Sequence, residues 1–236
     1  MSGPFEPGTT TVLTHVRNQL ALHHLRAGAG RPLLLLHGLG EATPASVPEE
    51  LAAWPGPIHG LDLTGHGASS LPRGGGYTAE ILMADVDHAL EHLGECTIVG
   101  RGLGAYVALL IAGARPRLVA GAILRDGPGL AGGGPSPTSP SSVRPWALGE
   151  HGTPPTGTPD PFALAELARD IRPPDYAGTY LRQALQFSGL ENPIYVTSVV
   201  RPPWLAAVAA EPGVVDTDLD AALAAAAVAE RGPVEE

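Results

Sequence analysis

Lysine is absent from this chain of 236 residues, and its fourteen cations are all arginine. The 24 Asp and Glu residues outweigh them, so the formal net charge is −10 at pH 7. Because no basic stripe is present to neutralise phosphates, we expect neither a nucleic acid partner nor binding to an anionic membrane surface. Arginine without lysine, with abundant alanine, glycine and proline, is typical of GC-rich bacterial genomes.

Cysteine occurs only once, at Cys96, so no disulfide can form within the chain. Its place in an apolar run favours a small core residue over a reactive thiol. No apolar stretch reaches the roughly 20 residues that span a bilayer. The N-terminus also lacks the charged and apolar segments of a secretion signal. These absences predict a cytoplasmic protein.

The most informative stretch, residues 96–114, predicts a buried strand that turns sharply into a buried helix. Gly100 and Gly104 lie at this turn, with the spacing of the outer glycines in G-x-S-x-G, the nucleophile elbow. Small residues there let the helix pack closely on the strand, and the middle residue takes a positive φ. Here the middle residue is Gly102. Glycine adopts a positive φ with the least steric strain, but it has no side chain that could attack a carbonyl.

Two further buried strands lead into recognisable turns. Residues 32–37 end in His37-Gly38, and residues 57–62 lead into D-x-x-G-H-G-x-S, which begins at Asp62. Asp62 and His66 are of the types that tie a glycine-rich turn by hydrogen bonds. With the elbow, these motifs resemble the α/β-hydrolase family over residues 10–128, and residues 162–231 resemble it more weakly.

The resemblance implies an α/β fold with a mostly parallel sheet of seven or eight strands, helices on both faces, and a shortened cap and C-terminus. Further segments are expected in this order: a loose tail at 1–9, the core at 10–128, a flexible loop and reduced helical cap at 129–190, and the rest of the core at 191–236. The expected helices are 77–94, 162–170, 175–187, 204–210 and 218–231, with strands at 10–17, 19–26, 118–125, 193–200 and 214–215.

The resemblance also implies two backbone donors of an oxyanion hole, the N–H groups of Leu39 and Leu103. His37, Gly38 and Gly102 surround them, and the family implies that His37 braces the loop rather than acting as a base. Some members take the acid of their triad from the position of Asp126, whereas in others an Asp there binds the following loop. A pair of amides above an apolar pocket can bind a carbonyl or carboxylate.

The rest of a Ser-His-Asp triad is missing from the sequence. The strand at 193–200 is followed by Arg201-Pro202-Pro203, where the family usually has its acid. The last histidine of the chain is His151, so no His follows the final strand. Without nucleophile, acid and base in place, the triad mechanism cannot run.

Three functions remain open. The first is a non-catalytic homologue that binds a small acyl or carboxylate ligand, or acts as a regulatory protein with a partner. The second is a divergent hydrolase of esters or other acyl substrates, with Ser69 or Ser70 as nucleophile and His66 or His151 as base. The third is a scaffold subunit.

No metal or cofactor is expected. Adjacent His23 and His24 point to opposite faces of a strand and make a poor metal pair. On the 77–94 helix, His88 and His92 favour a solvated face, since the H-E-x-x-H order is absent. The apolar stripe of the same helix predicts that Asp85 and Asp87 face solvent.

Overall fold

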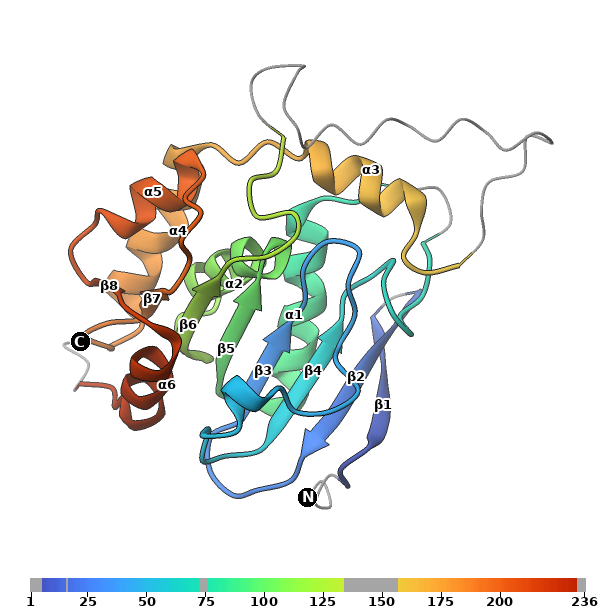
Figure 1. Cartoon of the computed structure of the whole chain (residues 1–236), viewed down its shortest axis with the longest axis horizontal. Coiled ribbons are helices and arrows are strands. Elements are labelled where there is room, and N and C mark those ends of the chain that lie inside the picture. Colours follow the sequence, from blue (N-terminus) through green and yellow to red (C-terminus); the bar gives the residue numbers. More distant parts are fainter. Residues whose placement is uncertain (1–5, 16, 73–75, 134–156, 233–236) are drawn as a thin grey trace.

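The computed structural model describes residues 6–15, 17–72, 76–133 and 157–232. These residues form an eight-stranded sheet in the order β1-β2-β4-β3-β5-β6-β7-β8 (Figure 1). β1 pairs antiparallel with β2, and β2 with β4, whereas all later pairs are parallel. The strands are β1 (Thr9–His15), β2 (Asn18–Arg26), β3 (Leu33–Leu36), β4 (Ile58–Asp62), β5 (Cys96–Arg101), β6 (Val119–Arg125), β7 (Ile194–Val196) and β8 (Val214–Asp216).

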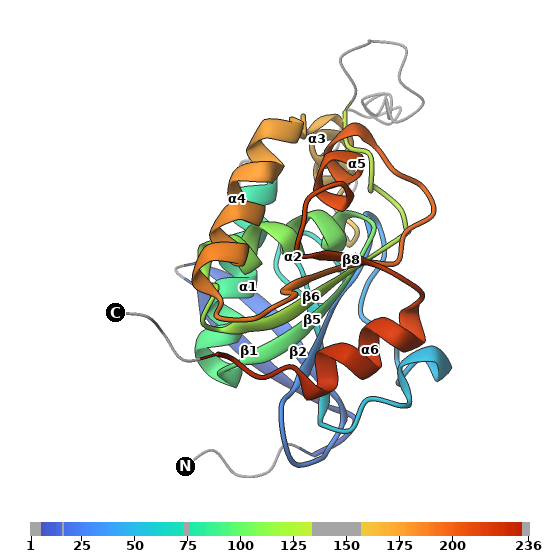
Figure 2. The ribbon, with the colours of Figure 1, turned by 90° about the vertical axis from the view of Figure 1, so that its left-hand side faces the viewer.

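Helices cover both faces of the sheet (Figure 2). They are η1 (a 3-10 turn, Glu49–Leu51), α1 (Ala79–Leu93), α2 (Leu103–Ala114), α3 (Pro161–Arg169), α4 (Pro174–Phe187), α5 (Pro203–Ala209) and α6 (Leu219–Val228). One core cluster joins the sheet to the buried sides of α1, α2, α4 and α5. A smaller cluster, on the opposite face, joins it to α6 and to Leu51 of η1. The predicted fold class is confirmed.

The boundaries differ from the sequence prediction in informative places. β7 ends at Val196 instead of continuing to residue 200, because Ser198–Val200 turn aside to hydrogen-bond to Asp126. α4 buries Ala177, Leu181 and Ala184 in the main core beside α2, so it lies in the helix layer and not in a cap. The predicted flexible lid falls mainly on residues 134–156, outside the described residues.

Asp85 on α1 is buried, and the prediction that it faces solvent is wrong. Its carboxylate accepts hydrogen bonds from the backbone N–H of Thr64, at 2.8 Å, and from the Thr64 hydroxyl, at 3.0 Å. Burial raises the pKa of Asp85 to about 7 against the opposing effect of these bonds. Asp87 is partly exposed and pairs with Arg115 at 2.6 Å. Asp85 therefore ties α1 to the turn after β4.

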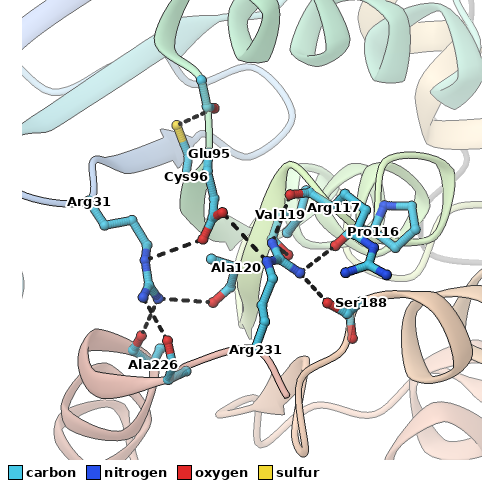
Figure 3. Close-up of polar contacts among 12 residues, drawn as sticks. Arg31, Glu95, Cys96, Pro116, Arg117, Val119, Ala120, Ser188, Ala226 and Arg231 are labelled. Atoms are coloured by element: carbon cyan, nitrogen blue, oxygen red, sulfur yellow. Dashed lines mark hydrogen bonds and ion pairs between the residues drawn. The ribbon is translucent and has the colours of Figure 1, made fainter. Parts of the chain in front are cut away.

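Two arginines fasten the C-terminal segment to the end of the sheet where β5 and β6 begin (Figure 3). Arg31 donates to the carbonyls of Ala226, at 3.0 Å, and Ala229, at 2.7 Å. Both carbonyls lie at the C-terminal end of α6, where the helix dipole favours a positive charge. Arg231 and Arg31 both form ion pairs with Glu95, at 3.5 and 3.7 Å. Arg231 also donates to the carbonyls of Pro116, Arg117, Val119 and Ser188. The opposite edge of the sheet, at the carboxyl ends of the parallel strands, carries the elbow.

None of the helices in the described ranges is both long enough and apolar enough to span a membrane.

Candidate functional site

The elbow between β5 and α2 has the backbone geometry that its glycines predict. Gly102 has φ +59° and ψ −116° and precedes the first residue of α2. A Cβ on Gly104 would lie 2.5 Å from the carbonyl oxygen of Leu36, so α2 packs directly against β3. The turn therefore places Gly102, which has no side chain, at the carboxyl ends of the parallel strands.

The backbone N–H groups of Leu39 and Leu103 converge on one oxygen atom. Leu39 donates to the carbonyl of Pro128 at 3.0 Å, and Leu103 donates to the same carbonyl at 2.9 Å. Leu103 is the first residue of α2, so the positive end of the helix dipole also faces this oxygen. The two amides predicted to be oxyanion-hole donors are therefore both occupied by a carbonyl of the chain itself.

We call residues 127–130, which follow β6, the plug. A Cβ on Gly102 would overlap the Pro128 carbonyl oxygen, and a Cβ on Gly38 would lie 2.9 Å from the Pro128 ring. On the plug itself, a Cβ on Gly129 would lie 2.6 Å from the Cβ of Leu39. Glycine at these three positions is what lets the plug lie directly against the elbow.

Buried side chains hold the plug in this place. Arg172 donates to the carbonyl of Gly129 and, at 2.8 Å, to that of Leu130. Trp204 donates from Nε1 to the Leu130 carbonyl at 2.9 Å. The Arg172 guanidinium lies 4.7 Å from the centre of the Tyr106 ring, and burial lowers its pKa to about 10, so it stays charged at neutral pH. Three successive carbonyls, 128 to 130, are thus each bound by the rest of the fold.

His37 braces the loop after β3 and has no ring nitrogen left for proton transfer. Its Nε2 accepts from the N–H of Leu63 at 3.0 Å, so its Nδ1 carries the proton and donates to the carbonyl of Gly38 at 2.8 Å. Burial lowers the pKa of His37, which keeps the ring neutral. The side chain fixes the loop that carries the Leu39 amide.

An ion pair that the sequence reasoning missed lies beside the elbow. Arg101 and Glu41 form a two-pronged pair, at 2.9 Å between Nε and Oε2 and 3.0 Å between Nη2 and Oε1. Glu41 also accepts from the N–H of Gly38 at 3.0 Å. Partial burial opposes ionisation of Glu41, but Arg101 and the Gly38 amide lower its pKa overall. The only signal in the sequence was a charged residue at the end of one buried strand, Arg101 in β5, and another in the loop after β3.

Asp126, the candidate acid, binds the turn after β7. Its carboxylate accepts from the Ser198 hydroxyl at 2.5 Å and from the N–H groups of Val199 and Val200 at 2.7 and 3.0 Å. Desolvation works against the charge, but these hydrogen bonds lower the pKa of Asp126 overall. The geometry matches the loop-binding alternative rather than an acid that orients a histidine.

The turn after β4 places Ser69 and Ser70 in structural hydrogen bonds. The buried Ser69 hydroxyl donates to the carbonyl of Asp62 at 2.5 Å and accepts from the N–H of Ala21 at 2.9 Å. Ser70 Oγ accepts from the N–H of Gln19 at 2.9 Å. Asp62 accepts from the N–H of Ala68 at 2.8 Å. These serines therefore join the turn to β2.

His66 is buried, and its Nδ1 lies 3.3 Å from the carbonyl of Thr64. Burial lowers its pKa to about 4. His151, the other candidate base, lies outside the described residues. Over the described ranges, no group of three or more His, Cys, Asp and Glu side chains is arranged to hold a metal ion.

Comparison with known proteins finds likeness in structure only. No protein-family model matches the sequence, and no curated protein matches it. Three solved structures, each 18% identical to this chain, cover most of it. The thioesterase domain from the curacin biosynthetic pathway has a TM-score of 0.57, over 93% of this chain and 98% of that one.

The N-formylmaleamic acid deformylase of Pseudomonas putida has a TM-score of 0.54, over 89% of this chain and 92% of that one. A membrane phospholipase A, described as a bacterial virulence factor, has a TM-score of 0.51, over 89% and 78% of the two chains. At 18% identity these likenesses show the fold alone. The chain has the α/β-hydrolase fold.

Proposed function

We propose that this protein is a non-catalytic, ligand-binding homologue of the α/β-hydrolases. One observation carries the non-catalytic part of the proposal: the Pro128 carbonyl accepts hydrogen bonds from both the Leu39 and Leu103 amides, directly over Gly102. In an acyl-transfer enzyme these donors stabilise the oxyanion that forms during attack on the substrate. Here they are satisfied by the fold itself.

The chemistry of the elbow supports this proposal from three sides. Gly102 supplies no oxygen or sulfur, so no covalent intermediate can form there. His37, close by, has both ring nitrogens in structural hydrogen bonds. The carboxylate of Asp126 accepts hydrogen bonds from the turn at 198–200 instead. Gly102 thus offers no nucleophile, His37 offers no free base, and Asp126 is not available to orient a histidine.

A small acyl or carboxylate ligand can reach the Leu39 and Leu103 amides only if the plug moves. Opening would break hydrogen bonds to Pro128, Gly129 and Leu130 and would expose the buried Leu130 side chain. Each such bond contributes about 0.5–1.5 kcal/mol. Binding away from these amides is therefore the expected mode.

The divergent-hydrolase alternative is less well supported. Ser69 and Ser70 use their hydroxyls to join the turn to β2, and His66 is buried with a strongly lowered pKa. A scaffold role with an unknown protein partner would share the closed elbow and differ only in lacking a ligand. A test for ligand binding distinguishes the scaffold role from the ligand-binding role.

Two measurements test the proposal. A fluorophosphonate probe and p-nitrophenyl esters, with an intact serine hydrolase as positive control, should give neither labelling nor turnover above background. A thermal-shift screen with an acyl and carboxylate library should raise the melting temperature for at least one compound by mass action. Labelling that maps to a serine or to Cys96 would contradict the non-catalytic role. If no compound in the library raises the melting temperature, the scaffold role is favoured over ligand binding.

A further inference from the structure

The connection from β3 to β4 leaves a hollow against the sheet. Parallel neighbours in a sheet are usually connected through an α-helix that covers it. Here the described residues between Leu36 and Ile58 form only the three-residue turn η1. Between this connection and the strands lies a hollow of about 290 Å³, at the small end of ligand pockets.

The hollow is preformed because the connection is fastened on both sides of it. Near its start, the N–H of Thr43 donates to the Asp62 carboxylate at 2.7 Å. Near its end, Arg26 donates to the carbonyls of Ala52, at 2.9 Å, and Gly56, at 2.7 Å. The segment between these anchors is thus held over the sheet without a ligand, so little ordering is needed on binding.

The floor of the hollow is apolar. Leu35 of β3, Val99 of β5 and Leu51 of η1 line it, and all three belong to the smaller core cluster. Hydrocarbon placed against them would be removed from water at little cost to the protein. The floor therefore suits an apolar tail.

Two arginines stand side by side at its rim. Arg101 and Arg125 are register partners at the ends of β5 and β6, so their side chains lie on the same face of the sheet. Arg101 pairs with Glu41, and Arg125 pairs with Glu50 at 3.3 Å, where the Glu50 side chain is 49% exposed. Exposed ion pairs contribute little to stability, so an anionic head group can replace a glutamate.

We propose that this hollow binds a small organic anion with an apolar tail. The tail would lie on Leu35, Leu51 and Val99, and the head group would lie between the guanidinium groups of Arg101 and Arg125. This inference rests on the proposed ligand-binding function and gives it a site away from the closed elbow.

Calorimetric titration of the full chain with hexanoate, hexyl phosphate and hexan-1-ol tests the site. Hexanoate or hexyl phosphate should bind one-to-one, at least about tenfold more tightly than hexan-1-ol, because a charged hydrogen bond is lost with the alcohol. The better of the two anions identifies the head group as carboxylate or phosphate. Each methylene added from butyrate to hexanoate should tighten binding roughly fourfold.

Variants place the binding in the hollow. Arg125→Gln should weaken hexanoate binding by about tenfold or more. Ala42→Phe, at an exposed lining residue, should block the hollow without changing the core. Arg115→Gln breaks an ion pair with Asp87 on another part of the surface and should leave binding unchanged.

The site is refuted if neither anion binds at millimolar concentration, if the alcohol binds equally well, or if Arg125→Gln and Ala42→Phe both bind like the wild type. Such a result leaves the non-catalytic role standing, since covalent probe labelling decides that role separately. Conversely, labelling of a serine would contradict the proposed function whether or not hexanoate binds.

Discussion

Gly102 and Pro128 fit against each other only because Gly102 lacks a side chain: a Cβ there would overlap the Pro128 carbonyl oxygen. The middle residue of the elbow and the segment after β6 therefore depend on each other. A side chain at residue 102 and the observed path of the plug exclude one another, and the predictions below test this dependence.

Gly102→Ala should destabilise the fold strongly. The new methyl group must be held at φ +59° and must displace the Pro128 carbonyl. Strain and overlap together should cost at least about 3 kcal/mol in the free energy of unfolding, measured by urea denaturation. Gly178→Ala is the matched control, since Gly178 lies inside α4 with no close backbone neighbour, and it should be neutral or stabilising.

Gly102→Ser should suffer the same loss and gain no esterase activity, because an unassisted serine is a weak nucleophile at neutral pH. Turnover of p-nitrophenyl esters by this variant would show that a base lies within reach of residue 102. A loss below about 1 kcal/mol in Gly102→Ala would show that the plug leaves the elbow readily.

The Leu39 and Leu103 amides should be protected from hydrogen exchange in the ligand-free protein. First-turn amides of a helix normally lack a partner and exchange quickly, but Leu103 donates to Pro128. Arg172→Met removes the donor to the plug carbonyls at 129 and 130, so both amides should exchange roughly 10- to 100-fold faster.

The amide of Asp220, in the first turn of α6, provides a rapidly exchanging reference in the same spectra. Fast exchange at Leu39 and Leu103 in the wild type would contradict the closed elbow. Unchanged protection in Arg172→Met would show that this arginine does not hold the plug.

Asp126→Ala should lower the stability of the fold, because Asp126 braces the turn after β7. In the native protein the Val199 and Val200 amides and the Ser198 hydroxyl donate to the carboxylate. The substitution leaves these three donors without their acceptor. We expect a loss of about 2 kcal/mol by urea denaturation, reduced from a fully buried case by partial exposure. Asp216→Ala, which breaks the exposed pair with Arg201, should cost about 1 kcal/mol or less. Equal losses in the two variants would contradict the bracing role.

Acid should destabilise the fold through its buried histidines, His59 and His66 above all. Burial lowers the pKa of His59 and of His66 to about 4, from 6.5 for an unperturbed ring. Between these values the unfolded chain binds more protons, so the free energy of unfolding falls as pH falls. Each ring contributes up to about 1.4 kcal/mol per pH unit.

Asp85 opposes this trend, because its raised pKa lets the folded state take up a proton first. The buried rings of His24 and His37 also have lowered pKa values, so the histidines outnumber Asp85. Urea unfolding between about pH 7 and pH 5 should therefore still show declining stability. His66→Gln should flatten the decline, because it removes one of these buried rings. A wild-type curve that is level over this range would refute the prediction.

Local patterns in the sequence were enough to predict the sheet, the elbow and the bracing role of the glycine-rich turn. Apolar runs such as 96–99, and the glycines at 100 and 104, determine strand, turn and helix through contacts between near neighbours. The closed elbow depends on residues far apart in the chain: Leu39, Leu103 and Pro128 meet only after three strands align. No local pattern marks Gly127-Pro128 as the partner of Gly102.

Asp85 was misplaced for a related reason. The apolar stripe of a helix identifies which positions lie near the core. A carboxylate beside that stripe is nevertheless buried when another segment supplies hydrogen-bond donors to it. Thr64 supplies two such donors, its backbone N–H and its hydroxyl. That contact spans 21 residues and leaves no periodic signal.

Because the Pro128 carbonyl occupies the Leu39 and Leu103 amides, any dissolved molecule must compete with it to bind there. A group on the same chain is present at a fixed, high effective concentration, whereas a dissolved ester or acid must be supplied from solution. Dilute substrates therefore compete poorly for the two amides, however well their shape suits them. A chemical screen directed at the elbow would return blanks even for a molecule that complements it.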